Sequence, residues 1–217
     1  MVSTLKVNKI QIPNSDSDVI SLDASSGNIT IPKNITFNGT VTGDNNGMVL
    51  LQTVTANDVS SVTIGSSTLI TTDYSIYQIH CINIHPANDG VEFRCRMSKG
   101  GSIITGSEYE YSRNQHIHSS SFTNRGSNSD GIVNLAESVG GQADEHVSQI
   151  HTLYNPAETT FKKLVNFKSA SVDLSPNIAN NDGVYAHEGN TAAIDGMEYF
   201  FASGNISTGT FKLYGIK

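Results

Sequence analysis

Tryptophan is absent from this chain of 217 residues, and charged residues and cysteines are scarce. Charged residues make up 15% of the chain, against about 25% in an ordinary domain, so Ser, Thr and Asn must supply most of the polar surface. The formal net charge is −7 and no basic stripe is present, which argues against a nucleic-acid partner because such binding needs clustered Lys and Arg. Two cysteines allow one disulfide at most, which would matter little to a domain of this size.

Long apolar runs and helical patterns are also missing. No run of about 18 apolar residues occurs, so neither a membrane span nor membrane insertion is predicted. No window keeps an i, i+3, i+4, i+7 apolar stripe for three turns, so helices are not predicted. No signal peptide opens the chain, and we expect release by lysis, or by a dedicated route, if the protein acts outside a cell. The residues predict no cofactor.

Residues 1–46 are polar, and their apolar residues occur at isolated alternating positions. Alternation with period two predicts short β-strands that bury one or two side chains each. Such strands cannot offset their own ordering entropy, which is roughly 1–2 kcal/mol per residue of backbone. We therefore predict a β-strip that associates with identical copies of the chain or docks onto a larger assembly. The side chains predicted to be buried in these contacts are Ile29, Ile31, Ile35, Phe37 and Val41.

Residues 47–217 have longer apolar runs and enough length to bury a core. Alternating segments joined by Gly, Asn, Asp, Ser or Pro clusters are typical of antiparallel all-β domains, and we predict a β-sandwich of the jelly-roll kind. The hydrophilic stretch 112–146 is predicted to be an ordered surface loop region, since loops of this length are usually functional. Strands are predicted near residues 48–55, 60–65, 74–85, 90–98, 102–111, 148–154, 160–168, 196–202 and 209–216.

Both cysteines lie in one alternating segment. Its pattern predicts a β-hairpin centred on Asn88, in which Cys95 faces Cys81 on the apolar side. We interpret the two cysteines as reduced core thiols, with a cross-strand disulfide as the alternative. By the same alternation, the residues predicted to be buried are Phe93, Cys81, Cys95, Phe161, Val165, Phe167, Phe211 and Leu213.

Two histidines, His116 and His118, are spaced so that their imidazoles share one face of a strand, which suits a metal ion. Three copies around a threefold axis would supply six nitrogens, which is an octahedral set of ligands. The alternative is two solvated histidines in a Ser- and Asn-rich segment. We favour the second interpretation, so no metal site is predicted.

Carboxylates offer a candidate catalytic group at two places. Glu108 and Glu110 alternate with tyrosines, as a glycosidase pair could, and Asp144 could share a strand face with His146. No Gly-x-Ser-x-Gly occurs, and no Ser or Cys sits in a nucleophile elbow. We interpret these groups as solvated charges at strand edges and predict that the protein is not an enzyme. A carbohydrate-active enzyme is the alternative.

Several phrases of the sequence resemble virion proteins of bacteriophages. The opening GNITIPKNITFNGTVTG resembles the repeated strips of tail fibres, notably those of marine and cyanobacterial phages. YQIHCINIHPANDGVEFRCRM, HTLYNP and the closing SGNISTGTFKLYGIK resemble the β-sandwich heads of short phage structural proteins. The resemblance implies a strip that winds three chains together or tethers them to the virion, and a head that faces outward.

From these observations we expect a homotrimeric virion appendage protein that attaches the particle to a host surface, most simply to a glycan. It would be assembled in the host cytoplasm and held to other virion proteins through residues 1–46. A capsid decoration protein or a neck fibre is the alternative within virion biology. The receptor-binding residues expected around the stretch 112–146, where aromatic rings can stack on sugars and Arg can pair with acidic groups, are Tyr109, Tyr111, Arg113, His116, His118 and Arg125.

Overall fold

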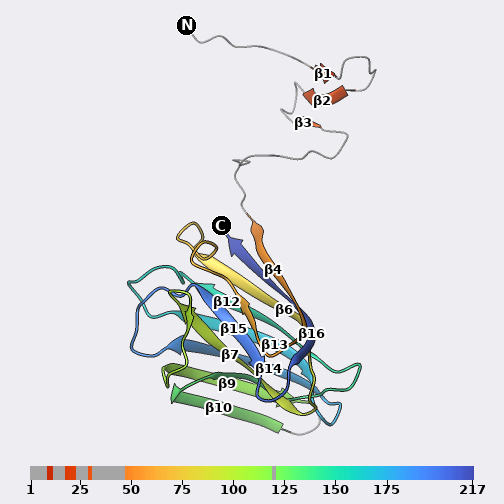
Figure 1. Ribbon diagram of the computed structural model, residues 1–217, viewed down its shortest axis with the longest axis vertical. Coiled ribbons are helices and arrows are strands. Elements are labelled where there is room, and N and C mark those ends of the chain that lie inside the picture. Colours follow the sequence, from red (N-terminus) through yellow and green to blue (C-terminus); the bar gives the residue numbers. More distant parts are fainter. Residues whose placement is uncertain (1–8, 12–17, 23–28, 31–46, 119–120) are drawn as a thin grey trace. The chain divides into compact units, whose positions relative to one another are not determined.

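The chain divides into two compact units, Met1–Asp44 and Asn45–Lys217. In the first unit, three short strands form an antiparallel sheet in the order β1-β2-β3. They are β1 (Lys9–Gln11), β2 (Asp18–Leu22) and β3 (Ile29–Thr30). The computed structural model describes residues 9–11, 18–22, 29–30, 47–118 and 121–217 (Figure 1).

The predicted docking side chains of the first unit are only partly covered by this description. Ile29 lies in β3 and pairs with Leu22 of β2. The other four, Ile31, Ile35, Phe37 and Val41, lie outside the described residues. Their burial against other copies of the chain therefore stays a prediction.

The second unit is an antiparallel β-sandwich, as predicted, and all the elements described in the chain are strands. The large sheet has the order β10-β9-β14-β13-β12-β6-β16-β4, and the small sheet has the order β11-β7-β15-β5, with β8 paired to β7. The described residues form no helix that could cross a membrane. The strands are β4 (Met48–Val59), β5 (Val62–Ile64), β6 (Ile76–Pro86), β7 (Val91–Lys99), β8 (Ser102–Ile103), β9 (Tyr109–Ile117), β10 (Ser121–Asp130), β11 (Val133–Val139), β12 (Val147–Tyr154), β13 (Leu164–Val172), β14 (Ile178–His187), β15 (Gly196–Phe201) and β16 (Ile206–Ile216).

Eight of these strands follow the path of a jelly roll (Figure 1). Without β8 and the pairs β9–β10 and β13–β14, the large sheet reduces to β4-β16-β6-β12 and the small sheet is β5-β15-β7-β11. The chain thus passes between the sheets in the order of two interleaved Greek keys. The pairs β13–β14 and β9–β10 extend the large sheet beyond β12, so that it is wider than the small sheet.

The core lies between the two sheets and is rich in aromatic rings. Phe93 and Tyr199 of the small sheet stack with 5.9 Å between ring centroids, and Tyr199 also packs on Phe211 of the large sheet at 5.4 Å. Alternation along each strand decides which side chains enter this layer. It correctly predicted the burial of Phe93, Cys81, Cys95, Val165, Phe167, Phe211 and Leu213.

The predicted burial of Phe161 is wrong, because this side chain is 76% exposed. The strand near it was expected to begin at residue 160, but β13 begins at Leu164. Phe161 therefore belongs to the β12–β13 connection, where alternation does not apply.

The predicted hairpin centred on Asn88 is also wrong, although its cysteines point into the core. β6 pairs with β12 and β16, whereas β7 pairs with β11, β15 and β8, so the two strands belong to opposite sheets. An alternating pattern shows which face of a strand is buried but not which strand is its neighbour. Cys81 and Cys95 are both buried and free, which confirms their interpretation as reduced core thiols.

The stretch 112–146 is not a loop region, since it contains most of β9 and all of β10 and β11. β10 has the sequence SFTNRGSNSD and forms the edge of the large sheet. Edge strands are commonly polar because one side of their backbone faces solvent. The same polarity makes β10 resemble a loop in the sequence. The sequence analysis also predicts no strand at β14, because the inward face of β14 includes the polar, buried Asn181 and so does not alternate cleanly.

Candidate functional site

Three residues expected to bind a receptor are buried instead. Tyr109, Tyr111 and Arg113 alternate along β9 and are 0%, 9% and 1% exposed. The hydroxyl of Tyr109 accepts a hydrogen bond from the backbone N–H of Met97 and donates one to the carbonyl of Ile104. The expectation that these three side chains present themselves to a receptor is therefore corrected, because β9 directs them toward the core.

The buried Arg113 belongs to an ion-pair network that joins the sheets. Its guanidinium donates to Oδ1 of Asn181 at 2.7 Å and to Oε1 of Glu137 at 2.8 Å. Arg125 on β10 pairs with the same Glu137 oxygen at 2.7 Å and with Glu92 of β7 at 3.2 Å. Arg125 is partly exposed, but its guanidinium is engaged within the chain, and the network ties the widened part of the large sheet to the edge of the small one.

His116 and His118 are both exposed. His116 pairs across the sheet with Asn180 and with Phe122, and neither neighbour is a metal ligand of the histidine or carboxylate type. Among the residues that the structure describes, no group of three or more His, Cys, Asp and Glu side chains is arranged to hold a metal. Of the predicted receptor residues, these two histidines and Arg125 are the ones that reach the surface.

Two of the carboxylates considered for catalysis, Glu108 and Glu110, have partners within the chain. Oε2 of Glu108 lies 2.6 Å from Nε2 of His187, and Glu110 accepts hydrogen bonds from Nζ of Lys162 at 2.9 and 3.0 Å. The hydrogen bond from His187 lowers the pKa of Glu108, which favours its ionised form. A glycosidase acid needs the opposite shift.

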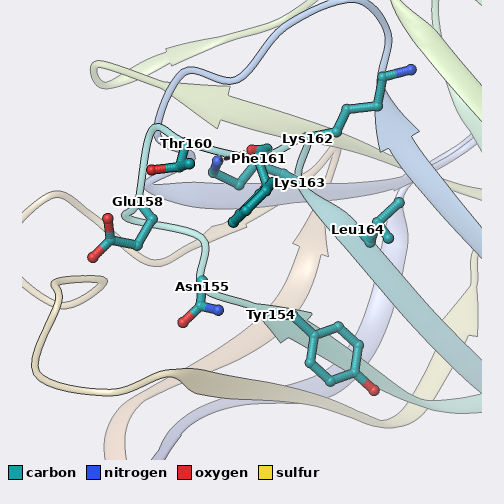
Figure 2. Close-up of a pocket in the computed structure, with 8 residues that line it drawn as sticks. All are labelled: Tyr154, Asn155, Glu158, Thr160, Phe161, Lys162, Lys163 and Leu164. Atoms are coloured by element: carbon teal, nitrogen blue, oxygen red, sulfur yellow. Dashed lines mark hydrogen bonds between the residues drawn. The ribbon is translucent and has the colours of Figure 1, made fainter.

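A hollow of about 480 Å³ lies where β12 ends and β13 begins (Figure 2). This volume is within the roughly 300–1,000 Å³ that is typical of ligand pockets. We call it the β12–β13 pocket. Its lining residues are Tyr154, Asn155, Glu158, Thr160, Phe161, Lys162, Lys163 and Leu164.

The loop that forms this pocket is held by backbone hydrogen bonds. Asn155 has a φ of 44°, which turns the chain sharply after β12. Its N–H donates to the carbonyl of Ser75 at 2.7 Å, and the N–H of Ile194 donates to the carbonyl of Pro156 at 2.9 Å. These bonds anchor the loop at its start to the rest of the sandwich, so the pocket wall has a defined backbone.

Lys163 anchors the far side of the loop. Its ammonium group is buried and donates to the backbone carbonyls of Phe161 and Thr191. Burial lowers the pKa of Lys163. The two residues before it, Phe161 and Lys162, are both exposed.

The exposed groups of the pocket combine aromatic rings with polar and charged hydrogen-bonding groups. Figure 2 shows the rings of Tyr154 and Phe161 with the side chains of Asn155, Glu158 and Thr160 around the hollow. Tyr154 is 42% exposed. An aromatic ring can pack on the C–H face of a sugar, while amide, hydroxyl and carboxylate groups can bond to its hydroxyls. The arrangement suits a polyhydroxylated ligand.

No protein family, curated protein or solved structure matches this chain.

Sequence reasoning missed the β12–β13 pocket because it assigned the receptor site to residues 112–146. A local signal was present: Tyr154 and Phe161 flank a turn that contains Asn155 and Pro156, and two lysines follow it. Exposed aromatic residues beside turn residues are candidates for binding. The signal was obscured because Phe161 was placed in a strand and counted with the core.

Proposed function

We propose that this protein is the trimeric attachment component of a virion appendage of the phage tail-fibre kind, and that it binds a host surface glycan in the β12–β13 pocket. The observation that carries the glycan assignment is the pair of exposed rings, Tyr154 and Phe161, beside hydrogen-bonding side chains in one hollow. Phe161 is 76% exposed and Tyr154 is 42% exposed, so both rings are open to a ligand. Binding would use stacking and hydrogen bonds, without chemical conversion of the glycan.

The assembly and location parts of the proposal rest on other observations. The resemblance of GNITIPKNITFNGTVTG to tail-fibre strips supports placement on a virion. The small separate unit Met1–Asp44, whose described strands have five residues or fewer, supports association with other copies, since sheets this small rarely fold alone. Jelly rolls serve many functions, so the fold itself does not carry the assignment.

The pocket is tested with the full chain on an array of bacterial capsular, O-antigen and neutral oligosaccharides. Phe161→Ala and Tyr154→Ala are compared with the unaltered chain, and Phe122→Ala is the matched control because Phe122 is a 66% exposed ring outside the pocket. For a glycan that binds, each pocket variant should raise Kd at least about tenfold, which corresponds to roughly 1.4 kcal/mol. Phe122→Ala should leave Kd unchanged.

Two outcomes would count against this assignment. Binding that survives both pocket variants would remove the β12–β13 pocket from the site. Binding to none of the array glycans, by a chain that is folded and assembled, would remove the glycan from the proposal. Location is tested separately by immunogold labelling of purified particles: label at the tail supports a fibre, whereas label over the capsid or collar supports a decoration protein or a neck fibre.

A further inference from the structure

The two outer surfaces of the sandwich differ in character. On the small sheet, outward-facing charges pair with one another, as in Arg96 with Glu198 at 3.5 Å, and Arg96 also lies over the ring of Phe200 at 4.7 Å. On the large sheet, the side facing away from the core carries most of the exposed large apolar side chains. They are Met48, Leu50, Ile82, Phe122, Ile150, Tyr154, Leu164, Ile178 and Val184.

Apolar residues are continuous across the jelly-roll half of the large sheet. Ile216 of β16 pairs with Met48 of β4 on one side and with Ile76 of β6 on the other, and Ile76 pairs with Tyr154 of β12. Residues paired directly across antiparallel strands project from the same face. These four side chains therefore form one apolar row that crosses four strands.

The next rows of the same half continue this surface. Tyr214 pairs with Leu50, and the ring of His80 lies 4.8 Å from that of Tyr214. Ile150 pairs with His80. The inward residues of these strands are already buried in the core, and β6, β12 and β16 also carry apolar side chains outward, interspersed with polar ones such as Gln78, Thr152 and Lys212. The outer face of an antiparallel sheet is commonly polar, so an apolar row there indicates that the face is covered.

We propose that this surface is where copies of the chain meet. We call it the association face and define it by Met48, Leu50, Ile76, Ile82, Ile150 and Tyr214. The inference deepens the trimer part of the proposed function, because it assigns the contact between copies to the sandwich and not only to residues 1–46. It meets the glycan assignment at Tyr154, which pairs with Ile76 of the face and also lines the β12–β13 pocket, so the two are tested by separate measurements.

Charge identifies a second copy of the chain as the occupant. The chain has a net charge of −7, so two copies repel unless they meet where carboxylates are missing. β6, β12 and β16 contain no Asp or Glu, and Lys212 supplies one positive charge among their outward residues. The small sheet, by contrast, carries Glu92 and Glu198 outward. Among the described strands, the association face is therefore a surface on which like copies can approach.

The size of the face is also appropriate. Four strands about 4.8 Å apart and about nine residues long, at roughly 3.3 Å per residue, cover about 600 Å². A stable interface buries about 800 Å² per partner. The face thus supplies most of the required area, and the short unit before β4 can supply more.

Cysteine labelling of the full chain tests the face. Ile150→Cys and Leu50→Cys place a thiol on the association face, and Thr63→Cys places one at an exposed outward position of the small sheet. The native cysteines are buried and give little background. In the assembled protein, the first two thiols should react with a maleimide at least about tenfold more slowly than the third. Melting temperatures of all three variants are measured to verify folding.

Light scattering on the same samples separates the outcomes. A trimer with protected thiols at 50 and 150 supports the association face. A trimer in which these thiols react as fast as that of Thr63→Cys overturns the face but leaves the trimer, which would then depend on residues 1–46. A folded monomer overturns both the face and the trimer of the proposed function, while the glycan array result stands on its own.

Discussion

Arg113 on β9 and Glu137 on β11 form an ion pair between the two sheets, with 2.8 Å between Nη2 and Oε1. The arginine side chain is 1% exposed, whereas that of the glutamate is 24% exposed. Asn181 supplies a second acceptor for the guanidinium at 2.7 Å. This pair fastens the added strands of the large sheet to the edge of the small sheet, in a place where sequence reasoning had expected a receptor site.

Replacing Arg113 by Met should destabilise the protein by about 3 kcal/mol, because the buried Asn181 oxygen loses its donor and Glu137 keeps only the exposed Arg125 as a partner. Arg125→Met is the control: Arg125 also pairs with Glu137 but is 44% exposed, so its loss should cost less than about 1 kcal/mol. Denaturant unfolding of both variants measures the difference. Equal losses would contradict the structural role assigned to Arg113.

Two phenylalanines in opposite environments test the core. Phe93→Ala should cost roughly 3–5 kcal/mol, since its ring is fully buried against Tyr199 and Phe201. Phe161→Ala should change the free energy of unfolding by no more than about 0.5 kcal/mol, because the ring is exposed. Thermal or chemical melts provide the measurement. A large loss at Phe161 would show that this ring packs on the protein and is not available to a ligand.

His151 should make the protein less stable in mild acid. Its imidazole is fully buried between the hydroxyl of Tyr185 and the side-chain carbonyl of Gln149, each at 2.9 Å, and burial lowers its pKa to about 3. The unfolded chain binds the proton near pH 6.5, so the stabilisation is complete above that pH and is lost as pH falls toward 3. Between pH 7 and pH 5 the loss is about 2 kcal/mol, at roughly 1.4 kcal/mol per pH unit.

The variant His151→Gln supplies the comparison for this pH dependence. It removes the titrating group, so its free energy of unfolding should change less between pH 7 and pH 5 than that of the unaltered chain. The absolute stability of the variant does not matter, because only the slope is compared. Identical slopes would mean that His151 has the same pKa in the folded and unfolded states.

The thiols of Cys81 and Cys95 should be unreactive in the folded protein. Both are fully buried, and burial raises the pKa of each, so few thiolates are present to attack a disulfide reagent. Ellman's reagent should detect almost no thiol under native conditions and two per chain in guanidinium. Rapid native reaction, or fewer than two thiols after unfolding, would contradict the burial or the reduced state.

Much of the candidate site could not be predicted from the sequence, because a local sequence pattern does not show which strand lies across the sheet. The Ser- and Asn-rich segment around β10 looked like a binding loop, yet it is an edge strand whose polarity protects an exposed backbone. Arg113 and Tyr111 looked like surface groups because nothing in their neighbours shows that β9 turns them inward. Phe161 looked like core because its neighbours alternate. In each case burial depends on what lies across the sheet.

The sequence by itself determined that residues 47–217 form an antiparallel all-β domain, and it determined the inward face of most of the strands that it predicted, because period-two alternation reports directly on which side of a strand is apolar. Only the tertiary structure decided which strands are neighbours. β6 and β7 are adjacent in the chain but lie in opposite sheets, and β9 joins β14 across more than sixty intervening residues. All strand backbones offer the same hydrogen-bonding groups, so the local sequence does not determine which strands pair. The pairing depends on closure of the core, which involves residues far apart in the chain.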